Sequence, residues 1–273
     1  MPSNEKTNPL GTVTRLFLSS KESKEKRRGE NAEAVIWLAV SDGGMNRAYL
    51  TAGFAEAFSD HRLNVTLLEL CSGLPNIGYY FALEPVQYLL SVVEKEHVVA
   101  GRWSERLGYL SARSTNVMIG YRNRMLPLNY PHMLFLSFTF PSSVPGHHSL
   151  FDVRRVTQAY TGLENEGAGI PDAVVAVGEG NDERTVEFIE NVREIFPDTL
   201  LLQIATVEES GLESNEKGTI DAEGWAIPRS VCYGSSRRVP PGDLLFSELA
   251  GNILQLLSFR RKKSMKGSDV KGA

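Results

Sequence analysis

The feature that most constrains the fold is an apolar run that ends at a glycine pair and passes directly into a helical pattern. Residues 35–40 read Val-Ile-Trp-Leu-Ala-Val, and one serine later come Asp42, Gly43 and Gly44. A continuous apolar run is typical of a strand buried on both faces of a parallel sheet. A glycine turn between such a strand and a helix aims backbone N–H groups and the helix N-terminus at an anion. The layout therefore predicts the geometry of a phosphate-binding loop.

The side chains of this loop lack the groups that bind phosphate and Mg²⁺ in a phosphate-binding loop. Arg47 stands where a lysine is expected to reach phosphate, and Ala48 stands where a hydroxyl is expected to bind Mg²⁺. A planar guanidinium cannot copy a compact ammonium, and alanine offers a metal no oxygen. We therefore predict a vestigial nucleotide-binding loop that consists of Asp42, Gly43, Gly44, Met45, Asn46, Arg47 and Ala48.

The composition is that of an ordinary globular protein. Of 273 residues, 42% are hydrophobic and 23% are charged. No run approaches the ~18 apolar residues of a membrane span, and the polar first residues lead into no apolar signal core. Cys71 and Cys232 are too few for a disulfide framework. These features predict a cytoplasmic location, with peripheral contact at the inner face of the membrane as the alternative.

Charge is distributed unevenly along the chain. Residues 1–30 hold seven Lys/Arg against four Glu, residues 260–273 hold six against one Asp, and the body between them is net −12. An acidic body argues against nucleic-acid binding, so no nucleic-acid partner is expected. Charge runs at the ends of a chain are usually solvated.

Strand and helix patterns alternate through the middle of the chain. Strands are predicted at 35–40, 64–70, 107–110, 133–140, 172–177 and 200–205, and helices at 48–59, 86–96, 150–162, 182–195 and 244–259. Units of this length require right-handed crossovers and a parallel sheet. The predicted fold class is α/β, a doubly wound, mostly parallel sheet with helices on both faces in three layers. Residues 1–33 are predicted to be a disordered leader, 34–259 one domain, and 260–273 a basic flexible tail.

Several segments carry a resemblance to a known family. They are the loop at 42–49, Leu74-Pro75-Asn76-Ile77 after the second strand, 81–85, 171–177, 224–229 and 239–242. In order and spacing they resemble the MinD/ParA group of deviant Walker-A ATPases, of the SIMIBI class, along most of 34–259. The resemblance implies a P-loop NTPase-like fold, a nucleotide-sandwiched dimer, and ATP with Mg²⁺ as cofactors.

The departures from that family argue against its chemistry. Asp42 takes the position of the signature lysine that reaches the partner's phosphates, and its negative charge repels them. Asn46 replaces the third loop glycine and adds bulk, although asparagine tolerates positive φ better than most residues. The family's third strand ends in an aspartate that orients Mg²⁺, but residues 136–141 read Leu-Ser-Phe-Thr-Phe-Pro. Glu69 preserves an acid at the end of the second strand, and beside Arg47 it can equally form a structural ion pair.

Other groups of residues have simpler interpretations. His147 and His148 lack a third ligand at sensible spacing, which favours a loop pair over a metal site. Cys71 has no flanking base, which favours a small buried or loop cysteine over a reactive thiol. The arginines scattered over 97–131 favour a solvated face over an anion-binding or partner surface. No catalytic residue and no metal ligand is predicted.

The predicted C-terminal helix has two interpretations. Its apolar residues cover a broad arc of 244–259 and lead into Arg260-Arg261-Lys262-Lys263. A broad arc favours packing on the sheet with a basic fringe. MinD-like proteins, however, carry a C-terminal amphipathic helix that lies on the membrane, and the basic cluster suits a weak contact with an anionic membrane.

The function expected from these features is regulatory. We expect a catalytically degenerate MinD/ParA-like protein that acts as a regulatory, scaffolding or localisation factor through protein contacts, as a homodimer or with other partners, and hydrolyses little or no ATP. No cofactor is expected. One alternative is a divergent ATPase that binds ATP and Mg²⁺ and in which Arg47 and Glu69 support slow turnover. The other is a nucleotide or anion sensor that binds at Gly43-Gly44 without hydrolysis.

Overall fold

Strands and helices follow one another along most of the chain from Ala34 to Ser268. The computed structural model describes residues 34–41, 46–73, 77–81, 88–91, 96–121, 131–141, 148–161, 169–179, 182–207, 225–228, 231 and 244–268. In chain order its elements are β1 (Ala34–Val40), α2 (Arg47–Asp60), β2 (Val65–Leu70), α3 (Ile77–Tyr80), β3 (Tyr88–Ser91), β4 (Glu96–Arg102), β5 (Leu107–Ala112), α4 (Thr115–Tyr121), β6 (Met133–Thr139), α5 (Leu150–Thr161), β7 (Ala173–Glu179), α6 (Glu183–Ile195), β8 (Leu200–Val207), β9 (Trp225–Pro228) and α9 (Leu244–Ser268).

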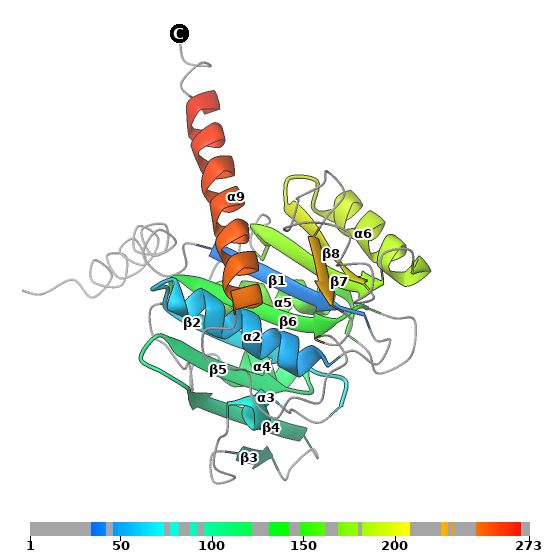
Figure 1. The fold of residues 1–273 in the computed structure, drawn as a ribbon. Helices are drawn as coiled ribbons and strands as arrows, with labels where there is room; N and C mark the ends of the chain where they lie inside the picture. The colour runs from blue at the N-terminus through cyan, green and yellow to red at the C-terminus, as the bar shows by residue number, and fades with distance from the viewer. Residues whose placement is uncertain are drawn as a thin grey trace, which may run out of the picture.

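The strands of the described residues form one nine-stranded sheet in the order β3-β4-β5-β2-β6-β1-β7-β8-β9 (Figure 1). The pairings from β5 to β9 are parallel, and the pairings β3–β4 and β4–β5 are antiparallel. From the central pair the chain leaves in opposite directions, because α2 leads from β1 past β6 to β2 and α5 leads from β6 past β1 to β7. This arrangement makes the carboxyl ends of β1 and β6 the topological switch point of the sheet.

Alternate residues of β1 enter two separate apolar cores. Ile36, Leu38 and Val40 belong to the core that α2, α3 and α9 cover, and Val35, Trp37 and Ala39 belong to the core that α4, α5 and α6 cover. All seven residues of β1 are buried, as a strand in the middle of a parallel sheet requires. The predicted α/β class, with a mostly parallel sheet and helices on both faces, is confirmed.

Helix α9 packs on α2 through a stripe of buried residues at helical spacing. The stripe consists of Phe246, Leu249, Ala250, Ile253 and Leu257. Beyond it α9 continues away from the sheet (Figure 1). The helix end predicted at Phe259 is therefore too early. The physical reason is that residues 260–268 contain no proline and are rich in Arg and Lys, which favour a helix.

The helix predicted at 86–96 is wrong. The region instead contributes β3 and β4, which pair with each other and with β5 in antiparallel fashion at one edge of the sheet. Pairing of consecutive strands at the edge of the sheet overrides the helical pattern of these residues. Strand β9 and helix α4 were not predicted either, since each is short and has a weak pattern. None of the described helices is long and apolar enough to cross a membrane.

Candidate functional site

Helix α2 is capped by the residue that precedes it. The side-chain Oδ1 of Asn46 accepts a 3.1 Å hydrogen bond from the backbone N–H of Tyr49, which satisfies one donor of the first turn. The side-chain Nδ2 of Asn46 donates to the Tyr80 hydroxyl. Asn46 has φ −77°, so the tolerance of asparagine for positive φ is not used. The other turn residues of the predicted loop, Asp42, Gly43, Gly44 and Met45, lie outside the described residues.

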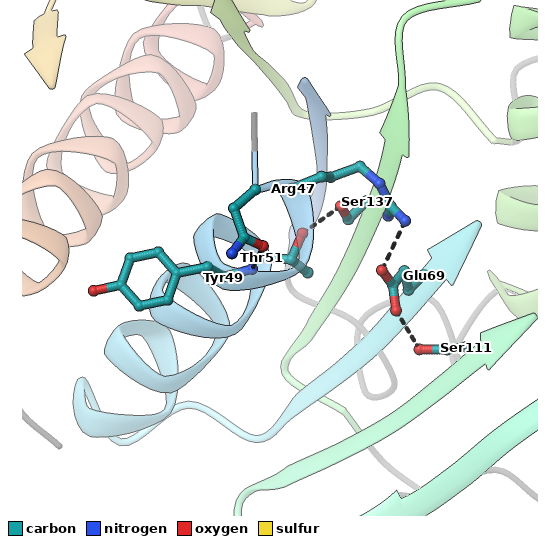
Figure 2. Close-up of polar contacts among 7 residues, drawn as sticks. Arg47, Tyr49, Thr51, Glu69, Ser111 and Ser137 are labelled. Carbon is teal, nitrogen blue, oxygen red and sulfur yellow. Dashed lines mark hydrogen bonds and ion pairs between the residues drawn. The ribbon is translucent and has the colours of Figure 1, made fainter. Parts of the chain in front are cut away.

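Arg47 pairs with the carboxylate of Glu69. Nη2 of Arg47 and Oε1 of Glu69 lie 2.8 Å apart, and the two side chains are 11% and 0% exposed. Figure 2 shows the guanidinium reaching from the start of α2 to the end of β2. The other carboxylate oxygen, Oε2, accepts a 2.6 Å hydrogen bond from Ser111 Oγ. The structural ion pair that the sequence left open is therefore present, and it holds the only side-chain cation of the predicted loop.

The ion pair engages only one of the two terminal nitrogens of the Arg47 guanidinium. Its contact with Oε1 has the distance of a charge pair but lacks the geometry of a hydrogen bond, and Nη1 of Arg47 is buried without a hydrogen-bond partner. A guanidinium presents several N–H donors in a fixed fork. One arm of the Arg47 fork therefore keeps its hydrogen-bonding capacity unused.

Glu69 belongs to a row of buried polar side chains that crosses three strands. Ser111 on β5 and Ser137 on β6 are its register partners on either side. Ser137 Oγ lies 2.6 Å from the hydroxyl of Thr51, which follows Arg47 by one turn of α2. Residues four apart share one face of a helix. One face of α2 is therefore fixed to the sheet by two polar contacts, as Figure 2 shows.

Neither position that the family resemblance assigns to Mg²⁺ binding carries an oxygen ligand suited to it. Ala48 is 1% exposed and packs in the core beneath α2. Strand β6 and the two residues after it, Phe140 and Pro141, contain no carboxylate. Mg²⁺ prefers carboxylates and phosphate oxygens as ligands. At these two places the described residues therefore provide neither a side-chain oxygen at position 48 nor a carboxylate at the end of β6.

A second polar group surrounds the end of β2. His148 lies beside the backbone of Cys71 and of Arg113, which follow neighbouring strands, and its Nε2 is buried without a hydrogen-bond partner among the described residues. Burial lowers the pKa of His148, although the polar backbone of Cys71 and Arg113 and the charge of Asp152 oppose that shift. Asp152 in turn accepts hydrogen bonds from the backbone N–H and the hydroxyl of Ser149, over 3.1 Å and 2.8 Å. The start of α5 is thereby joined to the ends of β2 and β5.

Cys71 is buried, as the sequence predicted. Burial raises the pKa of its thiol to about 12, and the neighbouring Glu69 carboxylate adds to the increase. A thiol with this pKa is protonated at neutral pH and is a poor nucleophile. In the ranges that the structure describes, no three His, Cys, Asp or Glu residues are grouped so as to hold a metal ion. His147 lies outside those ranges.

The arginines predicted to line a solvated face are exposed where the structure describes them. Arg102, Arg106 and Arg113 are exposed, and Arg106 donates a 2.6 Å hydrogen bond to the backbone oxygen of Arg62. Sequence reasoning missed the hydroxyl partners at the site, Thr51, Ser111 and Ser137. The signal that could have revealed Ser111 and Ser137 is their position inside apolar strand patterns, where a polar side chain needs a buried partner.

Comparison with known proteins gives structural likeness alone. No protein-family model and no curated protein matches the chain. The chain is similar to the cell division ATPase MinD of Pyrococcus furiosus (12% identity, TM-score 0.49), with 82% of this chain and 99% of that chain covered. It is similar to an Archaeoglobus fulgidus nucleotide-binding protein in complex with ADP (16%, TM-score 0.46, 84% and 90% covered). It is also similar to a ParA-family ATPase of Chlorobium tepidum (12%, TM-score 0.43, 81% and 98% covered). The fold class itself rests on the strand order and helix placement of this chain.

Proposed function

We propose that this chain is a catalytically degenerate regulatory or scaffolding protein that acts through protein contacts and hydrolyses little or no ATP. The observation that carries the proposal is the Arg47–Glu69 ion pair. Arg47 is the side-chain cation at the start of α2, and a fully buried carboxylate compensates its charge. Turning Arg47 toward a phosphate would leave that carboxylate buried without its cation, which costs about 3–5 kcal/mol.

The missing Mg²⁺ ligands support the same proposal. Phosphoryl transfer depends on a metal ion that neutralises charge on the terminal phosphates and on side chains that hold this ion. Ala48 cannot coordinate a metal, and β6 provides no carboxylate beside β1. Losses at two elements that meet at the switch point affect the same step of the reaction. The proposed protein therefore keeps the fold but lacks side chains that would hold Mg²⁺ for phosphoryl transfer.

The partners of such a protein are proposed to be other proteins, including a second copy of the chain. Helix α9 adds a proposed weak contact with an anionic membrane. Leu256 and Phe259 are 38% and 57% exposed, and the basic cluster Arg260-Arg261-Lys262-Lys263 follows directly. Apolar side chains beside a cationic cluster favour the surface of an anionic bilayer.

Nucleotide titration tests the proposed lack of hydrolysis. Fluorescent ATP and ADP are titrated with and without Mg²⁺, and phosphate release is then measured. The proposal expects neither Mg²⁺-dependent binding nor turnover. Turnover that is lost in Arg47→Ala but kept in Arg193→Ala, an exposed arginine of α6, would instead establish a divergent ATPase. Tight binding that is independent of Mg²⁺ and without turnover would establish the sensor.

A further inference from the structure

We propose that Glu69 is a built-in anion that neutralises Arg47, the side-chain cation at the start of α2, and so keeps it from binding phosphate groups. The inference rests on the proposed function and names the residue that decides what this end of the helix binds. Glu69 belongs to a strand of the sheet, so the excluding group is part of the rigid core. The described residues Asn46, Arg47, Glu69 and Ser111 carry the argument.

Two donors at the start of α2 that a phosphate could use are engaged by oxygens of the chain. Helix N-termini bind anions through free backbone N–H groups and a nearby cation. Here the N–H of Tyr49 donates to Asn46 Oδ1, and Nη2 of Arg47 contacts Glu69 Oε1. The side chains of Asn46 and Glu69 therefore compete with a phosphate for two donors at the start of α2.

The carboxylate of Glu69 is held so that a free anion competes poorly with it. It is 0% exposed, and Ser111 Oγ donates a 2.6 Å hydrogen bond to its second oxygen. Ser111 is its direct register partner on β5, so the backbone pairing of two strands fixes the donor in place. An internal group that is already positioned loses little further freedom when it binds, whereas a free phosphate loses translational and rotational freedom.

The unpaired Nη1 of Arg47 is a donor that an anion could use if Glu69 lost its negative charge. Nη1 is buried and has no hydrogen-bond partner in the structure. Arginine binds phosphate best through two parallel N–H donors. When Glu69 is changed to a neutral group, the positive charge of Arg47 is no longer compensated and both arms become available. Loss of one acid is therefore expected to create anion binding.

Calorimetric titration with inorganic phosphate and with pyrophosphate, without Mg²⁺, tests the inference. The proteins are the full chain, Glu69→Gln, the double variant Glu69→Gln/Arg47→Gln, and Glu190→Gln. The last variant removes one negative charge from an exposed position on α6 and is the matched control. Glu69→Gln is expected to bind pyrophosphate about tenfold or more tightly than the full chain, which corresponds to about 1.4 kcal/mol. The double variant is expected to lose this gain, and Glu190→Gln to behave like the full chain.

Two results would overturn the inference. One is a folded Glu69→Gln protein that binds no more pyrophosphate than the full chain. The other is equal gain in Glu69→Gln and Glu190→Gln, which would reflect net charge alone. If Glu69→Gln does not fold, Ser111→Ala loosens the carboxylate while both charges stay in place. A smaller gain in pyrophosphate binding is then expected, and a folded Ser111→Ala protein without any gain overturns the inference. Failure of the proposed function is a separate result, namely turnover of Mg²⁺-ATP by the unchanged chain.

Discussion

Phe246 of α9 lies so close to Gly53 of α2 that a Cβ added to Gly53 would come within 2.5 Å of the ring. Phe246 is 1% exposed, and its ring contacts Tyr49 and Phe54 at centroid distances of 5.8 Å and 5.3 Å. The last helix is thereby packed directly on the helix that carries Arg47. A glycine is required at this crossing because the ring occupies the space of any side chain.

Two glycine substitutions in helices should have opposite effects on stability. Gly53→Ala forces the buried Phe246 ring to move, and overpacking of this kind costs about 1–3 kcal/mol. At Gly251 of α9 the added Cβ would meet the His61 ring at 3.5 Å, an ordinary contact. Gly251→Ala should therefore gain about 0.5–1 kcal/mol from helix propensity. Urea unfolding measures both, and a stabilised Gly53→Ala protein would refute the close packing.

Removing one partner of the Arg47–Glu69 pair should lower the free energy of unfolding strongly, whereas replacing both partners should lower it little. Arg47→Met or Glu69→Leu leaves one buried charge alone and should lower the free energy of unfolding by about 3–5 kcal/mol. The double variant Arg47→Met/Glu69→Leu removes both charges, so it should recover most of that loss. Chemical denaturation of the four proteins completes the cycle. Additive losses in the double variant would contradict a direct pair.

Acid should destabilise the fold through His148 before it acts through Asp152. Burial lowers the pKa of His148, beside Cys71, Arg113, Asp152 and Arg47, so below about pH 6.5 the unfolded chain binds a proton that the folded chain resists. The free energy of unfolding therefore falls as pH drops through that range. His148→Gln should flatten the slope there. A slope unchanged in His148→Gln would assign it to other groups.

The second acid-sensitive group acts at lower pH. Burial opposes ionisation of Asp152, but its hydrogen bonds from Ser149 lower its pKa below the ordinary value. The stabilisation from Asp152 is therefore present above about pH 3.9 and is lost as pH falls through its folded pKa. The two steps are separable by measuring unfolding across both ranges. Ser149→Ala should weaken only the lower one.

Membrane contact should depend on the part of α9 beyond the buried stripe. A chain that ends at Ser258 keeps every buried residue of the stripe and lacks the basic cluster, so it should fold. The full chain should co-sediment with phosphatidylserine vesicles at low salt and be released by added salt, because each basic residue contributes about 1 kcal/mol near an anionic surface. Neutral vesicles are the control. Equal sedimentation of the shortened chain would end the membrane proposal.

The central strands and their helices could be predicted because each has a complete local pattern. Strand β1 is an unbroken apolar run, and α2 follows it directly with apolar residues at helical spacing. The edge of the sheet could not be predicted in this way. Residues 88–91 are a strand because they pair with β4, and β4 is a strand because it pairs with β5. The apolar period within a single segment does not show this pairing between consecutive strands.

The sequence predicted which charged residues belong to the candidate site, but it did not predict the contacts that they and the neighbouring hydroxyls make. Arg47 and Glu69 stood out because they occupy positions that the family resemblance marks. That they face each other follows from the register of β2 and the placement of α2, which the sequence left open. The buried hydroxyls of Thr51 and Ser137 escaped notice because a single Ser or Thr in an apolar segment is common, and only the fold shows that these two meet.

The row that joins Ser111, Glu69 and Ser137 across three strands also limits how this protein can change. Restoring a phosphate-reaching lysine at position 47 would place it against the same buried carboxylate, and removing the carboxylate first would leave a buried cation alone. Loss of the carboxylate alone passes through a form destabilised by about 3–5 kcal/mol, whereas a lysine alone stays paired with Glu69 and does not reach a phosphate. Positions 47 and 69 should therefore be exchanged together when sequences diverge, and the present pair tends to persist once formed.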